Sequence, residues 1–467
     1  MRTPTLLLAF ISLQLSAQQP RIWGMTTSGG ANNKGVVFAV DADGSGFSTV
    51  FDFDEASGWS PEGGLCLAPN GLLYGTTMMG GEAVPAAGTL FTIDPVIGTF
   101  TKLIDFNITN GGFNQGTLIV GADGLLYGAA YGGTTGGGSI FTVDPATNTY
   151  TELYALNQSV DGAGIHSRLL QTSDGLLYGA ASQGGANAES GTLFSYDIAN
   201  DVFTKLHDFD GAAGGRTPYG GLCQAEDGWL YGTTFEGGTG NSGIVYKYDP
   251  VNDEFEKVFD LDDAGGSNCW NTLVNAGPDL LVAAVGSGGL NSGGFLFTLV
   301  PSSDTFTLVN SFAVATGISP VGSLVAGAGG PLYGLASLGG SGVYGTLYRF
   351  DPISLQRTTI HSFTNGPDGG QPRGEPLVIG TEVGIAETSA ISIFSVGPNP
   401  SSGQVTLHCH PAALPLQARI TDGMGRSVRT FVVTATTSVI DLGAAPRILS
   451  ITMTGSKGSR TEQVVVQ

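Results

Sequence analysis

The sequence predicts an all-β protein: a seven-bladed β-propeller closed by one C-terminal strand and three N-terminal strands, followed by a small β-sandwich. Three observations support this fold class. An aromatic–glycine pair, degenerate in one copy, recurs seven times at steps of 51 to 53 residues. A glycine pair follows each copy, and the two ends of the series are complementary. A repeat of this length is typical of propellers and solenoids.

Each repeat contains four short segments with strand character, separated by turn residues. In one repeat they are "GGLCLAP", "LLYGTT", "GTLFTID" and "TFTKLIDF", with turns at Asn70-Gly71 and Asp94-Pro95. Four such strands per repeat indicate a propeller blade. The repeated pairs are Trp23-Gly24, Tyr74-Gly75, Tyr127-Gly128, Tyr178-Gly179, Tyr231-Gly232, the degenerate Val282-Ala283, and Tyr333-Gly334.

The ends of the series favour a closed ring over residues 21–380. The series starts at a second strand, "IWGMTT", and ends with a lone first strand, "GEPLVIG", at residues 374–380. The C-terminal strand therefore supplies what the N-terminal blade lacks. An open β-solenoid is the alternative, but it does not explain why the two ends are complementary.

At these residues the chain resembles a known family. The string "DGLLYGTTxxGG…GTLFxxDP" resembles the GloVer tandem repeat of exported bacterial proteins, over most of residues 21–380. The order of strands, glycine pair and Asp-Pro hairpin is more distantly similar to kelch blades. The resemblance implies a propeller and brings no known reaction with it.

The N-terminal residues and the overall charge bear on localisation. Residues 1–17 have the layout of a secretory signal peptide, with a basic residue, an apolar run and a small residue at the cleavage position. No other stretch approaches the length of a membrane span. The formal net charge of −21 disfavours nucleic acid and anionic lipid as partners. We therefore expect a protein that is secreted or held at the outer cell surface.

The C-terminal part differs in composition from the repeats. Residues 381–392 are polar and small, as in a linker, and residues 393–467 contain short alternating strands between turns. This part resembles the C-terminal sorting domain of the type IX secretion system, found in Bacteroidota. The matching residues are Pro398, Asn399, Pro400, Asp422, Gly425 and Arg426. The resemblance implies the type IX machinery as a partner, passage through the outer membrane, removal of the tail, and release or surface anchoring.

The sequence contains no motif that points to catalysis. We find no nucleophile elbow, phosphate loop or zinc spacing, and we expect no catalytic or metal-binding residue. Asp41, Asp43 and Asp52 have a spacing that resembles a calcium loop. They lie between predicted strands and lack the terminal Glu, so a hairpin turn is the favoured interpretation and calcium the alternative. No cofactor is otherwise expected.

One set of variable positions stands out against the constant repeat. Three residues before the leucine of each first strand, the side chain changes from blade to blade. The positions hold Glu62, Gln115, His166, Tyr219, Trp270, Val321 and Gly374. In a propeller the loop that enters the innermost strand opens at one mouth of the central channel, and loops on a rigid scaffold often carry function. We take Glu62, Gln115, His166, Arg168, Tyr219 and Trp270 as candidate binding residues, with ordinary exposed loop residues as the alternative.

These candidates predict a lopsided site. The aromatic residues and Arg168 lie on consecutive blades. The arc with Val321 and Gly374 has fewer side chains that could bind a ligand. Three functions remain open: a non-catalytic propeller that binds a glycan or protein at its loop-rich face, a carbohydrate-active hydrolase or lyase, and a structural or adhesive surface protein. A hydrolase or lyase would need at least two convergent acidic or His/Tyr groups at the channel mouth, and the sequence places only Glu62 and His166 there.

Overall fold

The protein is described here by a computed structural model. In the N-terminal part it describes residues 20–187, 190–211, 213–261, 269–327 and 330–380. In the C-terminal part it describes residues 394–397, 404–409, 416–422, 427–434, 437–441, 447–455 and 458–466. The contacts divide the chain between residues 381 and 382 into two units, and each is considered by itself.

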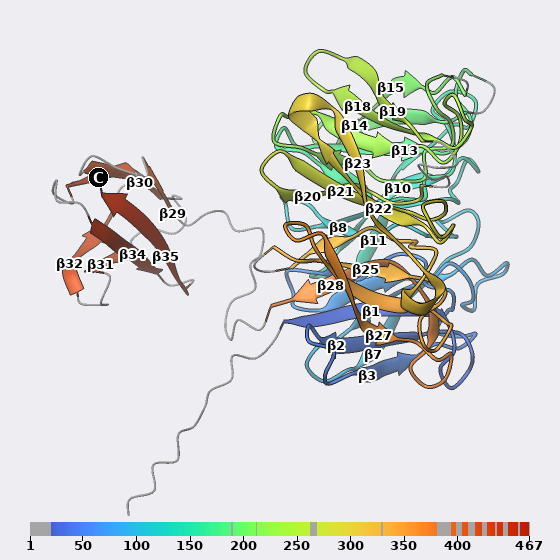
Figure 1. The fold of residues 1–467 in the computed structure, drawn as a ribbon, viewed down its shortest axis with the longest axis horizontal. Helices are drawn as coiled ribbons and strands as arrows, with labels where there is room; N and C mark the ends of the chain where they lie inside the picture. The colour runs from blue at the N-terminus through green and yellow to red at the C-terminus, as the bar shows by residue number, and fades with distance from the viewer. Residues whose placement is uncertain are drawn as a thin grey trace, which may run out of the picture. The chain divides into compact units, whose positions relative to one another are not determined.

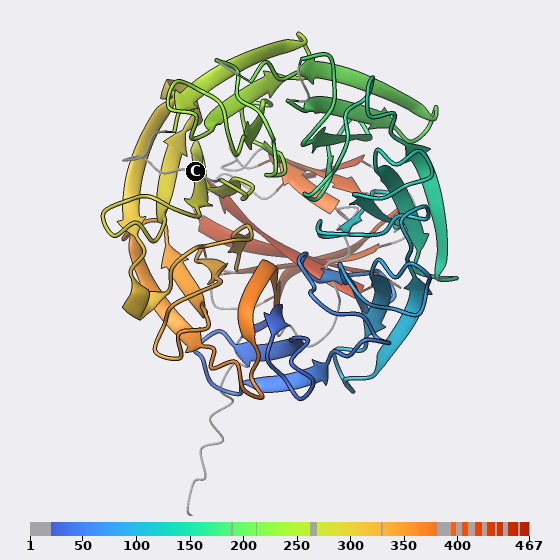
Figure 2. The same cartoon turned by 90° about the vertical axis from the view of Figure 1, so that its right-hand side faces the viewer.

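The described residues of the first unit form seven four-stranded antiparallel sheets. Figure 2 shows these sheets arranged as blades around a central axis, and Figure 1 shows the same ring from the side. Helical structure among the described residues is limited to two short 3-10 turns, Pro301–Ser303 and Val314–Thr316. The predicted all-β class and the seven blades are confirmed.

We number the blades in chain order and give their strands from the axis outward. Blade 1 contains β28 (Gly370–Ile379), β1 (Arg21–Ser28), β2 (Val36–Asp41) and β3 (Ser48–Asp52). Blade 2 contains β4 (Cys66–Leu67), β5 (Leu73–Thr76), β6 (Thr89–Ile93) and β7 (Phe100–Asp105). Blade 3 contains β8 (Ile119–Val120), β9 (Leu126–Ala130), β10 (Ser139–Asp144) and β11 (Thr149–Ala155). Blade 4 contains β12 (Leu170–Gln171), β13 (Leu176–Ala181), β14 (Thr192–Asp197) and β15 (Val202–Asp208).

The remaining three blades follow the same order. Blade 5 contains β16 (Cys223–Gln224), β17 (Leu230–Thr233), β18 (Ile244–Asp249) and β19 (Glu254–Asp260). Blade 6 contains β20 (Val274–Gly277), β21 (Leu280–Val285), β22 (Phe295–Val300) and β23 (Thr305–Ser311). Blade 7 contains β24 (Val325–Ala326), β25 (Leu332–Ala336), β26 (Thr346–Asp351) and β27 (Gln356–Ser362). In blade 1, β28 runs antiparallel to β1, with Leu377 opposite Trp23.

The hydrophobic core lies between neighbouring blades. The second and third strands are buried along most of their length because each of their faces packs against an adjacent sheet. The glycine of the aromatic–glycine pair has a steric cause within the blade. A Cβ atom on Gly75 would lie 2.6 Å from the ring of Phe91, its partner across the ladder. The glycine therefore leaves room for the aromatic ring of the third strand.

The tyrosine of the pair links the strand to the turn before it. The Tyr127 hydroxyl donates to the Asp123 carboxylate at 2.6 Å, and the Tyr231 hydroxyl donates to Asp227 at 2.9 Å. The same carboxylates accept backbone N–H groups two residues on. The recurring "DGxxY" string is thus a turn whose aspartate also satisfies a largely buried tyrosine.

The loops that connect blades share one face with the loops between second and third strands. Short bridges join the two kinds of loop in four blades, at Trp59 and Met79, Ala163 and Gln183, Arg216 and Glu236, and Ile318 and Leu338. The glycine pairs lie in these loops. Gly80 and Gly81 both adopt φ of +80° or more, and the next N–H, of Glu82, donates to Asp105 on the fourth strand. This pairing holds the loop-rich face against the blade.

The described residues of the second unit form two antiparallel sheets. One contains β29 (Phe394–Gly397), β30 (Gln404–Cys409) and β33 (Thr437–Asp441). The other contains β32 (Ser427–Val433), β31 (Leu416–Asp422), β34 (Arg447–Gly455) and β35 (Gly458–Val466). Asp422 ends β31. The other five residues of the predicted sorting motif, the predicted signal peptide and residues 381–392 lie outside the described residues.

No helix among the residues that the structure describes has the length and apolar character of a membrane span.

Candidate functional site

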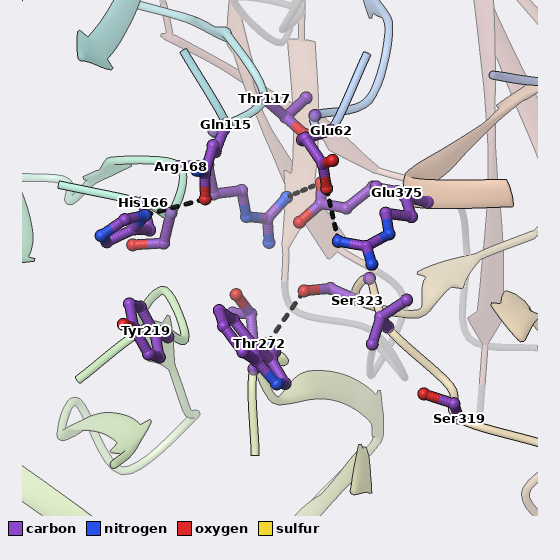
Figure 3. Close-up of a pocket in the computed structure, with 18 residues that line it drawn as sticks. Glu62, Gln115, Thr117, His166, Arg168, Tyr219, Thr272, Ser319, Ser323 and Glu375 are labelled. Atoms are coloured by element: carbon purple, nitrogen blue, oxygen red, sulfur yellow. Dashed lines mark hydrogen bonds and ion pairs between the residues drawn. The ribbon is translucent and has the colours of Figure 1, made fainter. Parts of the chain in front are cut away.

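A cavity of about 250 Å³ lies where the entry segments of the innermost strands converge. All seven blades contribute to its wall, and Figure 3 shows the lining side chains. The six candidate binding residues predicted from the sequence all line it. They are Glu62, Gln115, His166, Arg168, Tyr219 and Trp270.

The repeat positions these side chains through a buried anchor. Leu65, Leu118 and Leu169 are at most 4 % exposed, and Leu222, Leu273 and Leu324 are buried in the same way. The innermost strands that follow most of these leucines are only two residues long. The residue three positions before each leucine therefore lies at the inner mouth, whatever its chemistry.

In the C-terminal strand, the pairing of β28 with β1 changes which residue is equivalent to the leucine of the other blades. Leu377 lies opposite Trp23 just as Cys66 lies opposite Tyr74, so the equivalent of Leu65 is the buried Pro376. The position three residues before Pro376 is Arg373, one residue from the predicted Gly374. Both line the cavity, and so does Glu375. The expectation that this arc has little to offer is wrong, because it supplies two charged side chains.

Tyr219 and Trp270 line one side of the cavity, and together with Phe235, which packs against both rings, we call them the aromatic wall. The rings of Tyr219 and Trp270 stack with centroids 4.2 Å apart and planes 13° apart. Phe235 meets both rings edge-on, at 5.3 and 4.8 Å. Trp270 remains 40 % exposed, which is unusual for so large an apolar side chain. The wall is therefore held by aromatic packing and still offers ring surface to a ligand.

His166 continues the wall toward blade 3. Its ring meets Tyr219 edge-on at 4.6 Å, and its Nδ1 lies 2.8 Å from the Gln115 side-chain oxygen (Figure 3). An amide oxygen can only accept, so Nδ1 carries the proton and Nε2 keeps its lone pair. Burial lowers the pKa of His166 to about 4. The imidazole is therefore neutral at pH 7.

The opposite side holds two ion pairs. Arg373 lies 2.7 Å from Glu62, and Arg168 lies 3.2 Å from Glu375 (Figure 3). The two glutamate side chains are only 17 % and 14 % exposed. Arg168 belongs to blade 4 and Glu375 to blade 1, so this pair joins blades that are not neighbours. Sequence reasoning missed Arg373 and Glu375 because β28, the innermost strand of blade 1, is not followed in the sequence by the other strands of its repeat.

Hydroxyl side chains fix the entry segments to one another. The Gly64 N–H donates to Thr117 at 2.8 Å, the Gly221 N–H donates to Thr272 at 2.9 Å, and the Thr272 N–H donates to Ser323 at 2.9 Å. The last of these bonds is drawn in Figure 3. Each bond crosses from one blade to the next, so the mouth of the cavity is held by contacts between backbones and short side chains.

The three aspartates considered as calcium ligands lie in or next to a hairpin, and two of them accept hydrogen bonds from nearby groups. Asp43 accepts from the Ser45 N–H and hydroxyl, which lowers the pKa of Asp43, and Asp52 accepts from the Ala31 N–H at 2.6 Å. Asp41 ends β2 at the hairpin. Within the described ranges, no three His, Cys, Asp or Glu side chains are grouped so that they could hold a metal ion.

Comparisons with known proteins address the family and the fold. The family model described as the Gloeobacter/Verrucomicrobia repeat matches residues 11–189 and 165–390. The comparison with curated proteins gave no match. Among solved structures, the periplasmic gluconolactonase of Pseudomonas aeruginosa is 18 % identical, with a TM-score of 0.52, over 77 % of this chain and 98 % of that one. A candidate 6-phosphogluconolactonase of Bacteroides fragilis is 15 % identical, with a TM-score of 0.53, over 78 % and 99 %. At these identities the likeness shows the propeller fold alone.

Proposed function

Because this chain belongs to the Gloeobacter/Verrucomicrobia repeat family, we propose that it is an exported, non-catalytic propeller that binds a glycan in the seven-sided cavity. One observation carries the proposal: an exposed aromatic wall faces a set of planar, charged hydrogen-bonding groups within one cavity.

The chemistry of the wall fits a sugar ring. The C–H face of a pyranose is apolar and stacks on an aromatic ring, while its hydroxyl groups need donors and acceptors at the edge. The exposed ring surface of Trp270 supplies the apolar face. Arg168, Glu62 and Glu375 supply charged hydrogen-bonding groups, which form stronger bonds than neutral ones.

The rigidity of the mouth supports recognition. The bonds through Thr117, Thr272 and Ser323 hold the entry segments in place, and the ion pairs hold both arginines. A site that is organised before the ligand arrives loses less conformational entropy on binding.

Hydrolysis is a second candidate, favoured by the presence of two carboxylates, Glu62 and Glu375, in one cavity. A glycosidase of this kind needs one of its two carboxyl groups protonated as the general acid. Each glutamate already has an arginine as its partner in an ion pair. This arrangement suits binding better than acid catalysis.

Export completes the proposal. Residues 1–17 serve as the signal peptide, and residues 393–467 serve as the sorting domain that the type IX secretion machinery recognises and removes. The propeller is then released or held at the outer cell surface. Support comes from the two sequence resemblances and from the change of composition at residues 381–392.

The proposal is tested on the purified protein without residues 1–17. A glycan array measures binding, and release of reducing sugar from a panel of polysaccharides measures hydrolysis. We expect binding to at least one glycan and no release of sugar. Release of sugar would favour the hydrolase, and neither binding nor release would favour a structural or adhesive role.

A further inference from the structure

We infer that the cavity takes one uncharged sugar unit at the end of a glycan chain, and neither an acidic sugar nor an internal stretch of polysaccharide. This inference rests on the proposed function and adds the class of ligand. It follows from the size of the cavity, from the balance of charge on its wall and from an unpaired hydroxyl group.

The size of the cavity limits the ligand. Pockets that enclose a drug-sized molecule measure roughly 300–1,000 Å³. The cavity here measures about 250 Å³ and is surrounded by entry segments of all seven blades. A sugar chain that ran sideways through the wall would need an opening between blades, and bonds such as Gly64 to Thr117 join the neighbouring segments. A single terminal unit fits within this ring of entry segments.

The charges on the wall cancel. The charged lining side chains are two arginines and two glutamates, and each arginine is paired with a glutamate. An acidic sugar would have to draw Arg168 or Arg373 away from its partner. Glu375 or Glu62 would then remain largely buried without a counter-charge, which is costly. An uncharged sugar leaves both ion pairs intact and adds hydrogen bonds to them.

The wall also carries a hydroxyl group that lacks a partner. Ser167 is 8 % exposed, lines the cavity, and its Oγ atom has no hydrogen-bond partner among the described residues. Buried polar groups are normally paired. A sugar hydroxyl can donate to Ser167 or accept from it, so a ligand rich in hydroxyl groups satisfies it.

The net charge of the whole protein also disfavours acidic sugars. With a formal net charge of −21, the protein repels anionic ligands at long range, and the paired arginines do not offset this charge at the mouth. Acidic sugars therefore meet an unfavourable field before they reach the cavity.

The first experiment uses calorimetry with defined probes and the protein without residues 1–17. The probes are glucose, galactose, mannose and N-acetylglucosamine, their neutral oligosaccharides of two to four units, glucuronate and galacturonate. We expect at least one neutral sugar to bind, its uronate to bind at least tenfold more weakly, and affinity to change less than threefold from two units to four. Tighter binding of a uronate, or affinity that rises with every added unit, would overturn the inference and leave glycan binding intact. Failure of every saccharide to bind would overturn the proposed function as well.

The second experiment changes the charge balance. Glu375→Gln removes the partner of Arg168, and Glu62→Gln removes the partner of Arg373. Each variant should bind glucuronate at least tenfold more tightly than the parent protein. Glu55→Gln is the matched control, because Glu55 is paired with Lys34 outside the cavity and should leave uronate binding unchanged. Two folded variants, checked by circular dichroism, that both fail to gain uronate binding would contradict the role given to the ion pairs.

Discussion

The buried tyrosine hydroxyl groups of the blades differ in whether they have a hydrogen-bond partner. The ring of the third strand is a phenylalanine in five blades and a tyrosine in blades 5 and 7, at Tyr246 and Tyr348. Both tyrosines are 0 % exposed, and neither hydroxyl has a partner among the described residues. By contrast, the hydroxyl of Tyr231 donates to Asp227. The repeat thus contains tyrosine hydroxyl groups of both kinds: unpartnered ones on the third strand and a partnered one on the second strand.

We predict that Tyr246→Phe and Tyr348→Phe each raise the free energy of unfolding by about 1 kcal/mol, because a buried donor without a partner is removed. Tyr231→Phe is the matched control and should lower it by about the same amount, since it leaves Asp227 without its donor. Urea denaturation of the three variants measures the effect. Destabilisation by all three substitutions would show that the two hydroxyls have partners.

Three histidines make stability depend on pH. Burial lowers the pKa of His166 to about 4, and it also lowers the pKa of His207 and of His361. His207 stacks on Phe255 at 3.8 Å and His361 on Phe47 at 4.1 Å, and each pair joins two adjacent blades. Each folded pKa lies below the unfolded value of about 6.5, so the unfolded chain binds protons first as the pH falls.

We therefore predict full stability above pH 6.5 and a progressive loss as the pH falls from about 6.5 to about 4. The midpoint of thermal unfolding at pH 7.5, 6.0 and 5.0 measures it. His207→Phe, which keeps an aromatic ring on Phe255, should reduce the slope. A midpoint that stays constant over this range would contradict the burial of the neutral imidazoles.

Among the elements, β28 has two roles: it completes blade 1 and contributes side chains to the cavity. It pairs with β1 and supplies Arg373 and Glu375 to the cavity. Six of the seven entry positions could be predicted, because a leucine followed by a strand and a turn marks each of them. The seventh was displaced by one residue, since Pro376 stands in place of the leucine and the register shifts between Trp23 and Met25. Local spacing does not reveal such a shift; the pairing of β28 with β1 does.

We predict that a chain ending at residue 369 loses stability and aggregates, because β1 would then expose an unpaired edge. A chain ending at residue 380 keeps β28 and is the control. Thermal unfolding and gel filtration of the two proteins distinguish them. Equal midpoints and equal elution would mean that β28 does not contribute to the ring.

At the scale of the molecule, the residues that pack the blades are repeated, whereas the residues that line the cavity vary from blade to blade. Tyrosine, glycine and the turn aspartates repeat around the ring because every blade packs in the same way, so the number of blades could be predicted. The entry positions face the cavity and not the core, and they vary from Glu62 to Trp270 without disturbing the fold. Other lining residues form pairs between blades that are far apart in sequence, such as Arg168 with Glu375, and no spacing along the chain predicts such a pair.

We predict that deletion of residues 393–467 leaves the propeller folded and retains it in the periplasm of the native host. The prediction follows from the proposed role of this part as the sorting domain. Fractionation and immunoblotting of periplasm, outer membrane and medium measure it. Normal amounts of the truncated protein in the medium would show that the tail is not the export signal.

The central claim is that the aromatic wall in the cavity binds a saccharide, and calorimetry on Trp270→Ala tests it most directly. The titrant is a saccharide bound by the parent protein. Loss of an aromatic anchor costs about 2 kcal/mol, or about 30-fold in affinity. The 40 % exposure of Trp270 predicts little loss of stability. Trp59→Ala, on the same face but outside the cavity lining, should bind like the parent protein. Unchanged affinity in a folded Trp270→Ala protein would contradict the account.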